Sequence, residues 1–325
     1  MTFSKDNTSA NKVTKVLLII YLVALFCATT GCSQSAATND DNNDIAGTLS
    51  ADVLNEVSGA AVSRLYSNTF FVNNDSGDSS RFFAISFKGK LLSTFNFKGT
   101  ANNALGVKDC EDIAIGPGPE AGKNYIYLAD IGDNSATRSS IQVYRFAEPN
   151  SLEHTTTEVT ADVLDLEYPD GPRDAETIMI DPVEKMIYII SKREDTAHIY
   201  RCPLGFTDND KVQLGLCGRV VLEGSGAGKW IVSGNIAPDG NAVLLKTVSS
   251  VYYWKRSGNE PVYTTLQRKP IKQSAYAVHG QEEAITFSAA GDGYYILSEG
   301  AHSKIYFYKL EAGEFSEVKR MILIK

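Results

Sequence analysis

The sequence is poor in the residues and motifs on which many enzymes depend. Its 325 residues include only five cysteines, four histidines and two tryptophans. It contains no P-loop, no G-x-S-x-G phrase and no H-E-x-x-H phrase, the usual signatures of nucleotide hydrolases, serine hydrolases and zinc proteases. Positive charge is also scarce, because 31 lysines and arginines stand against 39 aspartates and glutamates. The net charge of -8 argues against a nucleic-acid partner, which would require a basic face.

What remains is an ordinary globular composition. The chain is 43% hydrophobic and 22% charged, which excludes a disordered chain, a collagen and a multi-pass membrane protein. Its 16 tyrosines and 14 phenylalanines favour β-strands. At about 150 residues per domain the length suggests two domains, but all-β domains often reach about 250 residues as one.

The beginning of the chain is organised like a secretory signal. Three lysines precede the apolar run Val16–Ala28, which is shorter than the roughly 20 residues that a membrane-spanning helix needs. The phrase TTGC at residues 29–32 then resembles the bacterial lipobox. That resemblance implies cleavage before Cys32, its lipidation and, because Ser33 is not aspartate, an outer-membrane location. A plain secreted protein cut near Ala28 is the alternative.

These features predict three parts. Residues 1–31 form the signal peptide, residues 32–44 the lipidated cysteine and a flexible tether, and residues 45–325 a single folded domain. Residues 33–44 contain no apolar side chain larger than alanine, so burial cannot offset the entropy of ordering them. Removal of the signal takes away three lysines and one aspartate and changes the net charge from -8 to -10. The lipid alone would therefore carry the membrane attachment.

The other cysteines fit an oxidising compartment. Cys202 and Cys217 flank a turn-like stretch, and we expect a disulfide between neighbouring strands that contributes about 3 kcal/mol. A metal site is the less favoured alternative, because no C-x-x-C phrase or nearby histidine accompanies the pair. Cys110 remains unpaired, either as a buried small apolar residue or as a nucleophile.

The order of strand-like runs repeats along the chain. Five units share a polar start and then apolar runs separated by turn residues, with aligned positions at 59, 111, 176, 234 and 283. Four strands per unit at a period near 50 residues indicate an all-β fold, a β-propeller of four-stranded blades. We expect five blades. Six is the alternative, because the 65-residue step from 111 to 176 is long enough to contain an irregular blade.

The propeller assignment predicts the places of three further strands. Residues 45–49 are expected to pair with the last blade and close the ring. Residues 261–268 (PVYTTLQR) are expected to form the fourth strand of the fourth unit, and residues 316–325 that of the fifth.

Several phrases resemble a known group of proteins. They are EVSGAAVS, NNDSGDSSRFFAIS, DCEDIAIGPG, YLADIGDNSATRSSIQVYRFAEP, DAETIMIDP and GQEEAITFSAAGDGYYILSEG. They are similar to phrases of bacterial secreted β-propellers of unassigned function and, more distantly, of esterase-like phytases and β-propeller phytases. The distant resemblance implies calcium and hydrolysis of phosphate esters. The six-bladed calcium-dependent phytases have a DDPA-type opening phrase that this chain lacks.

Polar residues occupy equivalent places in several units. In a propeller the first strand of each blade lines the channel, and its start lies near the rim that usually binds ligands. One set precedes or begins the first strands: Asp109, Glu111, Asp112, Asp174, Glu176, Glu282 and Glu283. A second set follows the second strands: Asp75, Asp130, Asp133, Lys192, Arg193, Lys246 and Glu299. We expect both sets to surround one mouth of the channel.

Converging carboxylates need a neutralising partner, because like charges at short range raise each other's pKa. Lys192, Arg193 and Lys246 could supply it and could contact an anion, or a calcium ion could be bound by oxygen ligands. Glu111, Glu176 and Glu283 are the candidate metal ligands. The alternative is that these residues only cap turns and anchor neighbouring blades.

Catalytic side chains are few at the predicted mouth. His279, just before Gly280, is the one histidine expected there and is a candidate general base. The favoured function is therefore a lipid-anchored envelope protein whose propeller binds a small molecule, an ion or a protein at an acidic mouth. A calcium-dependent hydrolase of phosphate esters is the alternative.

Overall fold

The computed structural model describes residues 43–153, 155–273 and 276–310. The predicted signal peptide, Cys32 and residues 32–42 of the predicted tether lie outside the described residues, as does the strand predicted at 316–325. Within the described part of the chain, no helix is long and apolar enough to cross a membrane.

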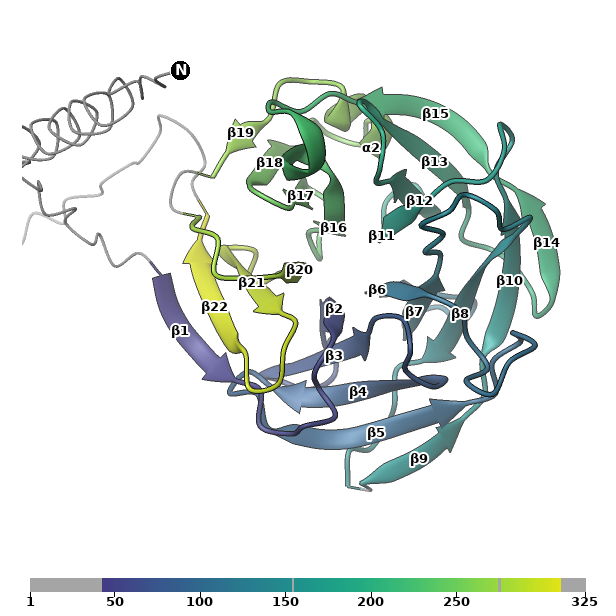
Figure 1. The fold of residues 1–325 in the computed structure, drawn as a ribbon, viewed down its shortest axis with the longest axis vertical. Coiled ribbons are helices and arrows are strands. Elements are labelled where there is room, and N and C mark those ends of the chain that lie inside the picture. Colours follow the sequence, from purple (N-terminus) through teal and green to yellow (C-terminus); the bar gives the residue numbers. More distant parts are fainter. Residues whose placement is uncertain (1–42, 154, 274–275, 311–325) are drawn as a thin grey trace, which may run out of the picture. The chain divides into compact units, whose positions relative to one another are not determined.

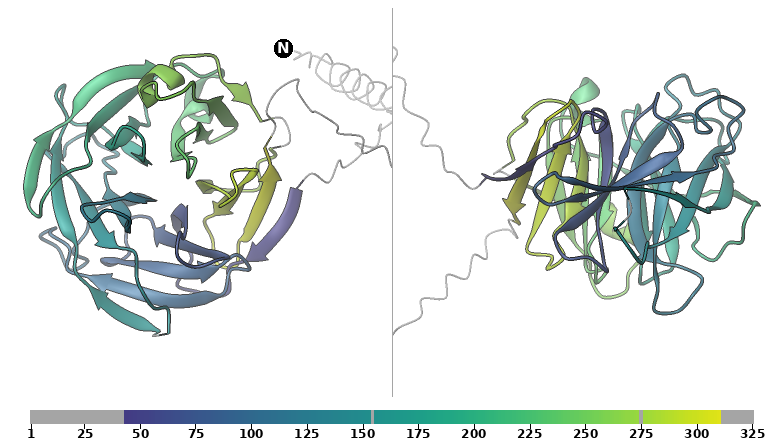
Figure 2. Two further views of the ribbon diagram at one scale, coloured as in Figure 1. Left: turned by 180° about the vertical axis from the view of Figure 1, so that it is seen from behind. Right: turned by 90° about the horizontal axis from the view of Figure 1, so that it is seen from below.

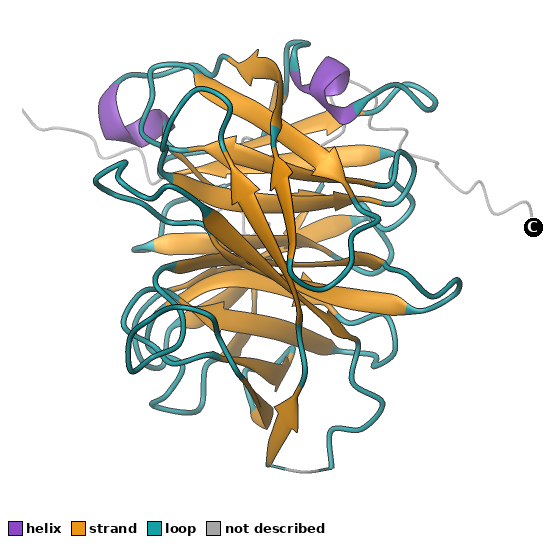
Figure 3. Ribbon diagram, turned by 90° about the vertical axis from the view of Figure 1, so that its right-hand side faces the viewer, coloured by secondary structure: helices purple, strands orange, loops and turns teal. Residues whose placement is uncertain are grey.

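The domain consists of five small sheets arranged around an axis, a five-bladed β-propeller (Figure 1). Strands account for 49% of the structure and helices for 3%. Figure 3 shows how the strands dominate, with short helices only at the periphery. The predictions of an all-β fold and of five rather than six blades are therefore confirmed.

Four strands, given from the axis outward, make up each of the first two blades. Blade 1 contains β2 (Val57–Val62), β3 (Thr69–Asn74), β4 (Arg81–Ser86) and β5 (Leu91–Phe97). Blade 2 contains β6 (Cys110–Pro117), β7 (Asn124–Asp130), β8 (Ile141–Ala147) and β10 (Asp162–Glu167).

The next two blades follow the same order. Blade 3 contains β11 (Ala175–Asp181), β12 (Met186–Ser191), β13 (Ala197–Pro203) and β15 (Gly215–Val220). Blade 4 contains β16 (Ile231–Ile236), β17 (Ala242–Thr247), β18 (Val251–Lys255) and β19 (Ile271–Lys272). A short 3-10 helix, Gly226–Lys229, precedes β16.

Blade 5 joins the two ends of the domain. It contains β20 (Glu282–Phe287), β21 (Gly293–Ser298), β22 (Lys304–Lys309) and, as its outermost strand, β1 (Asn43–Thr48). β1 pairs antiparallel with β22 and closes the ring, as the view from behind in Figure 2 shows. The predicted pairing of residues 45–49 with the last blade is confirmed for the strand up to Thr48.

Two outer edges are covered by a short strand of the next blade, from the connection between its third and fourth strands. β9 (Thr156–Val159) pairs in parallel with β5 of blade 1, and β14 (Asp210–Gln213) pairs in parallel with β10 of blade 2. An exposed edge strand would leave backbone donors and acceptors free to pair with another chain. The extra strand β9 accounts for the long 65-residue step that had suggested a sixth blade.

Each innermost strand contains a register shift close to its start. The shifts lie at Val57/Gly59, Cys110/Asp112, Ala175/Thr177, Ile231/Ser233 and Glu282/Ala284. A β-bulge leaves one residue unpaired and turns its side chain to a new direction. The equivalent bulged residues are Ser58, Glu111, Glu176, Val232 and Glu283. Two of the aligned positions in the sequence, 59 and 234, therefore lie one residue after the bulge of blade 1 and two residues after that of blade 4.

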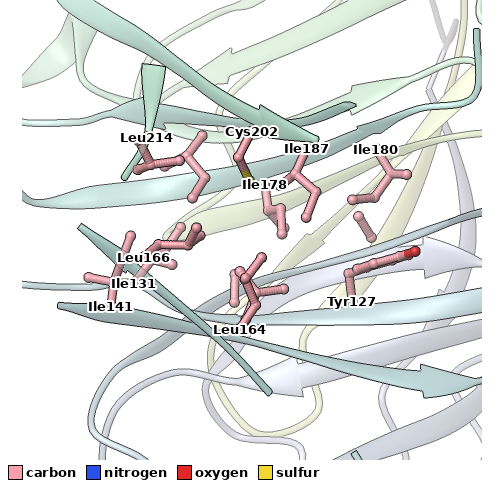
Figure 4. Packing of buried hydrophobic residues seen from close by; sticks show 14 of the residues in the cluster. Tyr127, Ile131, Ile141, Leu164, Leu166, Ile178, Ile180, Ile187, Cys202 and Leu214 are labelled. Carbon is pink, nitrogen blue, oxygen red and sulfur yellow. The ribbon is translucent and has the colours of Figure 1, made fainter. Parts of the chain in front are cut away.

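Apolar layers fill the spaces between neighbouring blades. Figure 4 shows one of them, where Tyr127 and Leu164 of blade 2 pack against Ile178 and Ile187 of blade 3. Four similar clusters occupy the other interfaces between neighbouring blades, including the interface between blades 5 and 1. A blade alone could not bury both of its faces, so stacking of the blades supplies the hydrophobic stabilisation.

The fourth strand of blade 4 is not where the sequence predicted it. Residues Val262–Leu266 form the helix α2, and the short strand β19 follows it. Pro261 fixes the backbone ahead of the helix, and its carbonyl accepts hydrogen bonds from the amides of Thr264 and Thr265. The prediction of a strand at 261–268 is wrong, because the buried residues Val262, Thr265 and Leu266 follow helical spacing.

The predicted disulfide between Cys202 and Cys217 is also wrong, since both thiols are free. Cys202 lies in the apolar layer between blades 2 and 3, whereas Cys217 packs against the layer between blades 3 and 4. The two side chains therefore lie on opposite faces of one blade. A disulfide requires side chains that point toward each other. Cys217 instead donates a hydrogen bond from its sulfur to the carbonyl of Ile199 at 3.3 Å.

Candidate functional site

The strand ends that carry the two predicted polar sets meet at one mouth of the channel. Each innermost strand begins beside the end of its neighbour, as the pairs Cys110 with Asp130 and Glu282 with Ser298 show. Residues that precede the inner strands are thereby brought beside residues that follow the second strands. The mouth has two chemically different halves.

Blades 3 and 4 supply the half in which charges are paired. Lys192 forms a buried ion pair with Glu176, and Arg193 Nε lies 2.5 Å from Asp174 Oδ2. Arg193 also stacks over the ring of Trp230, at 4.9 Å from its centroid. Of the three predicted metal ligands, Glu176 therefore already has a protein cation as its partner.

Blades 1, 2 and 5 supply the other half, in which five carboxylates gather. We call them the acidic cluster: Asp75, Asp109, Glu111, Glu283 and Glu299. The ligand oxygens of Asp75, Asp109 and Glu111 lie within 4.8 Å of one another, and so do those of Asp75, Glu283 and Glu299. Asp75 thus belongs to both groups of three. Among the described residues, no lysine, arginine or histidine forms an ion pair with any of the five.

Burial and mutual repulsion raise the pKa values in the acidic cluster. Burial, together with Asp75 and Asp174, raises the pKa of Asp109 to about 7. Burial and the neighbouring Glu283 raise the pKa of Glu299 to about 8. The pKa of Asp75 is also raised, mainly by burial. Without an added positive charge, part of the cluster is protonated at neutral pH.

Glu111 is the most confined member of the cluster. Its side chain is buried, with 2% of the residue exposed, and its Oε2 atom has no hydrogen-bond partner in the described part of the protein. Burial first, and then the charges of Asp75 and Asp109, raise its pKa well above the ordinary value. A buried, unpartnered carboxylate oxygen is costly. This atom is therefore available to a ligand that supplies positive charge.

Gly132 allows the cluster to pack this closely. A Cβ atom added at Gly132 would overlap Oε1 of Glu111 and Oδ2 of Asp109. The glycine of the DIGDN phrase is thus required for space rather than for a special backbone conformation. Asp109 lies in the acidic stretch before β6, but the sequence does not identify it as a candidate metal ligand. Its place in the cluster follows from its positions beside Gly132 and Asp75 in the structure.

The two aspartates of the DIGDN phrase have structural roles. Asp130 accepts hydrogen bonds from the amides of Lys108 and Asp109, both at 3.0 Å, and pairs with Arg138 at 2.8 Å. Asp133 accepts a hydrogen bond from the amide of Arg138 at 2.7 Å. These contacts hold the backbone that carries Asp109. Asp130 and Asp133 therefore support the cluster and do not belong to it.

Asp112 lies deeper and connects blades. Its Oδ2 accepts a hydrogen bond from the amide of Ile178 in blade 3 at 3.1 Å, and Ser233 Oγ of blade 4 lies 3.5 Å from its Oδ1. Ser233 Oγ in turn accepts from the amide of Ile285 in blade 5 at 3.4 Å. This set of bonds crosses the channel below the mouth, so Asp112 fits the anchoring alternative.

The remaining candidates are not part of the acidic cluster. Lys246 is fully buried, donates to the carbonyl of Thr247 at 3.0 Å and lies 3.9 Å from Glu282. Burial lowers the pKa of Lys246 to about 8. Tyr276 donates its hydroxyl to Glu282. His279 is exposed and stacks on Tyr306 at 4.2 Å, which gives no support to a role as general base.

Comparison with known proteins gives only a structural likeness. No family model matches the chain, and no curated protein matches its sequence. A candidate 6-phosphogluconolactonase from Bacteroides uniformis is 15% identical with a TM-score of 0.40, and the match covers 79% of this chain and 68% of that one. Kuenenia stuttgartiensis hydrazine synthase is 12% identical with a TM-score of 0.38, over 74% and 61%.

The WD40 repeats of RRP9 are similar to the same degree. They are 12% identical with a TM-score of 0.41, and the match covers 78% of this chain and 80% of that one. At such identities the likeness concerns the fold alone. The function is therefore argued from the mouth itself.

Proposed function

We propose that this is a lipid-anchored protein of the bacterial cell envelope whose propeller binds calcium at the acidic cluster and, through it, an anionic ligand. One observation carries the proposal: within residues 43–153, 155–273 and 276–310, five converging carboxylates have no protein cation as partner, and one of them contains a buried oxygen without a hydrogen bond. The lipid anchor rests on the lipobox-like phrase ending in Cys32.

The donor set favours calcium among the common metals. All five members are carboxylates, and none is a histidine or cysteine, the ligands typical of zinc and copper sites. Calcium accepts six to eight oxygen ligands in flexible geometry, including carboxylates, carbonyls and water. Each group of three can hold one ion, with Asp75 contributing to both.

The paired half of the mouth supports an anionic ligand. Arg193 keeps 36% of its side chain exposed although it pairs with Asp174. Lys192 lies near enough to the cluster for its charge to offset part of the rise in the pKa of Glu111 and of Asp75. A bound calcium and the exposed guanidinium would together attract a carboxylate or phosphate group of a small molecule or of a protein.

Calorimetric titration of calcium into the purified domain tests the proposal. Wild type should bind calcium, and Glu111→Gln should weaken binding at least about tenfold, because a neutral amide replaces a charged ligand of the same shape. Glu153→Gln, an exposed acid away from the mouth, is the matched control and should bind like wild type. Absence of calcium binding to wild type, or unchanged binding by Glu111→Gln, contradicts the proposal.

A second candidate function is calcium-dependent hydrolysis of phosphate esters. The observation in its favour is that Lys192 and Arg193 lie across the mouth from the acidic cluster, where they could contact a phosphate bound to calcium. Turnover of a chromogenic phosphomonoester, measured with and without calcium, distinguishes a binding protein from a hydrolase. Calcium binding without turnover supports a binding protein, and calcium-dependent turnover that Arg193→Met reduces supports the hydrolase.

A further inference from the structure

A second candidate site lies at the opposite end of the channel. The acidic mouth precedes the inner strands, whereas this cavity lies where three of them end. Ile115 of β6, Ile180 of β11 and Ile236 of β16 line it, and its volume is about 190 Å³. From Glu111 to Gly116 the strand rises roughly 17 Å at about 3.3 Å per residue, so the two sites are separate.

Arg64 is the charged residue that distinguishes this cavity. It lines the cavity from the turn that follows β2. Its guanidinium makes no hydrogen bond or ion pair with any described residue, although its backbone amide donates to Glu148 Oε1 at 2.8 Å. Burial lowers the pKa of Arg64, and the charge of Glu148 partly offsets this effect. A partly buried guanidinium without a paired acceptor is costly and attracts an anion.

Glu148 does not serve as the missing partner. Its Oε1 atom already accepts hydrogen bonds from Ser63 Oγ at 2.6 Å and from the amides of Arg64 and Leu65 at 2.8 and 3.1 Å. Oε1 therefore holds the turn that presents Arg64, and Oε2 forms neither a hydrogen bond nor an ion pair with the Arg64 guanidinium in the part of the chain that the structure describes. The second cation of the cavity, Lys185, is exposed and forms no ion pair among the described residues.

We propose that this cavity, which we call the Arg64 pocket, binds a small organic anion that carries a carboxylate on a short apolar chain. The planar guanidinium of Arg64 matches a carboxylate in two parallel hydrogen bonds. The isoleucines at the strand ends then cover the apolar chain. The volume equals that of about six liquid water molecules, which suits a ligand of few atoms. This inference goes beyond the proposed calcium site and does not depend on it.

Hexanoate is a suitable probe, with hexan-1-ol as its uncharged counterpart. In calorimetric titrations wild type should bind hexanoate at least about tenfold more tightly than hexan-1-ol, because only the carboxylate can pair with Arg64. Arg64→Met should weaken hexanoate binding at least about tenfold, since it keeps an unbranched chain and removes the charge. The variant should fold, because the guanidinium has no hydrogen bond to lose, and thermal unfolding checks this.

Two further variants separate the Arg64 pocket from other effects. Lys123→Met removes the same charge from the exposed turn before β7, where Lys123 pairs only with Glu120, and should bind hexanoate like wild type. Glu111→Gln alters the acidic cluster and should also leave hexanoate binding unchanged, so failure of the calcium proposal would not affect this result. Equal binding of hexanoate and hexan-1-ol, no hexanoate binding by wild type, or full binding by folded Arg64→Met overturns the inference.

Discussion

Calcium binding to the acidic cluster should be strongly coupled to pH. The pKa of Asp109 is raised to about 7 and that of Glu299 to about 8, whereas unfolded acids titrate near 4. Between about pH 4 and pH 8 the calcium-free folded state therefore binds more protons than the unfolded state. Its stability should fall as the pH rises through this window, because stability increases with pH only when the unfolded state binds more protons.

Calcium should reverse this trend by replacing the protons. With a pKa of about 7, Asp109 is about nine-tenths protonated at pH 6 and about one-tenth protonated at pH 8. Its group of three should then bind calcium about tenfold more tightly at pH 8. A calcium concentration of 100 times Kd at pH 8 stabilises by about 2.7 kcal/mol, whereas the same concentration at pH 6 stabilises by about 1.4 kcal/mol.

The assay is thermal unfolding with and without calcium across this pH range. At pH 8 the calcium-induced rise in Tm should be roughly 5–10 °C for a domain of this size, and at pH 6 about half of that. Asp109→Asn should make the calcium-induced rise in Tm less dependent on pH between pH 6 and pH 8, whereas Asp239→Asn, in an exposed loop, should leave that dependence unchanged. A calcium effect of equal size at pH 6 and pH 8, or calcium-free stability that does not fall with rising pH, would refute the reasoning.

Four other predictions concern the surroundings of the cluster and the anchor. Gly132→Ala should abolish the calcium-induced rise in Tm, because the added methyl group overlaps Glu111 and Asp109. Gly205→Ala adds a methyl group where there is free space and should keep the calcium-induced rise. An intact calcium response in Gly132→Ala contradicts this packing. Arg138→Met should lower the unfolding free energy in urea by about 3 kcal/mol, since it leaves the buried Asp130 unpaired, and wild-type stability in this variant contradicts the assigned role. Reductant should leave Tm unchanged because Cys202 and Cys217 are free thiols, and a clear drop in Tm would indicate a disulfide. Cys32→Ala should move the protein from the membrane to the soluble fraction, and its recovery in a salt-washed membrane pellet would exclude the lipid as sole anchor.

The fold could be predicted because its determinants are local and repeated. Each unit shows a strand period and turn residues, and a four-stranded blade that recurs near every 50 residues has few alternatives to a propeller. The bulges could not be located in this way. The sequence alignment matched Gly59 and Gly234 to the glutamates, whereas the unpaired residues are Ser58 and Val232. A one-residue shift moves every side chain of a strand to the other face.

The prediction of a disulfide is wrong for a similar reason, because the sequence does not determine which face of a strand a side chain occupies. Sequence separation brings Cys202 and Cys217 to neighbouring strands but does not determine which face of the blade each occupies. For α2, the run PVYTTLQR has the composition of a strand, and the proline at its start together with helical burial outweighs that preference. In both cases tertiary packing decides between alternatives that local sequence leaves open.

The sequence predicts where the candidate site lies, but not its division into a half with paired charges and a half with unpaired carboxylates. Asp75, Glu283 and Glu299 were expected at one mouth, where the structure places them. The sequence could not show that Glu176 is paired with Lys192 while Glu111 is left without a cation. That difference depends on side-chain positions across blades. That no lysine, arginine or histidine of the described residues pairs with Glu111 is the basis of the proposed calcium site.

The most direct test of that site is a crystal structure of the domain grown with calcium, examined by anomalous scattering. The account predicts an ion between Asp75, Asp109 and Glu111, with Oε2 of Glu111 among its ligands at about 2.3–2.6 Å. A mouth that contains only water at millimolar calcium, or a protein cation paired with Glu111, would contradict it.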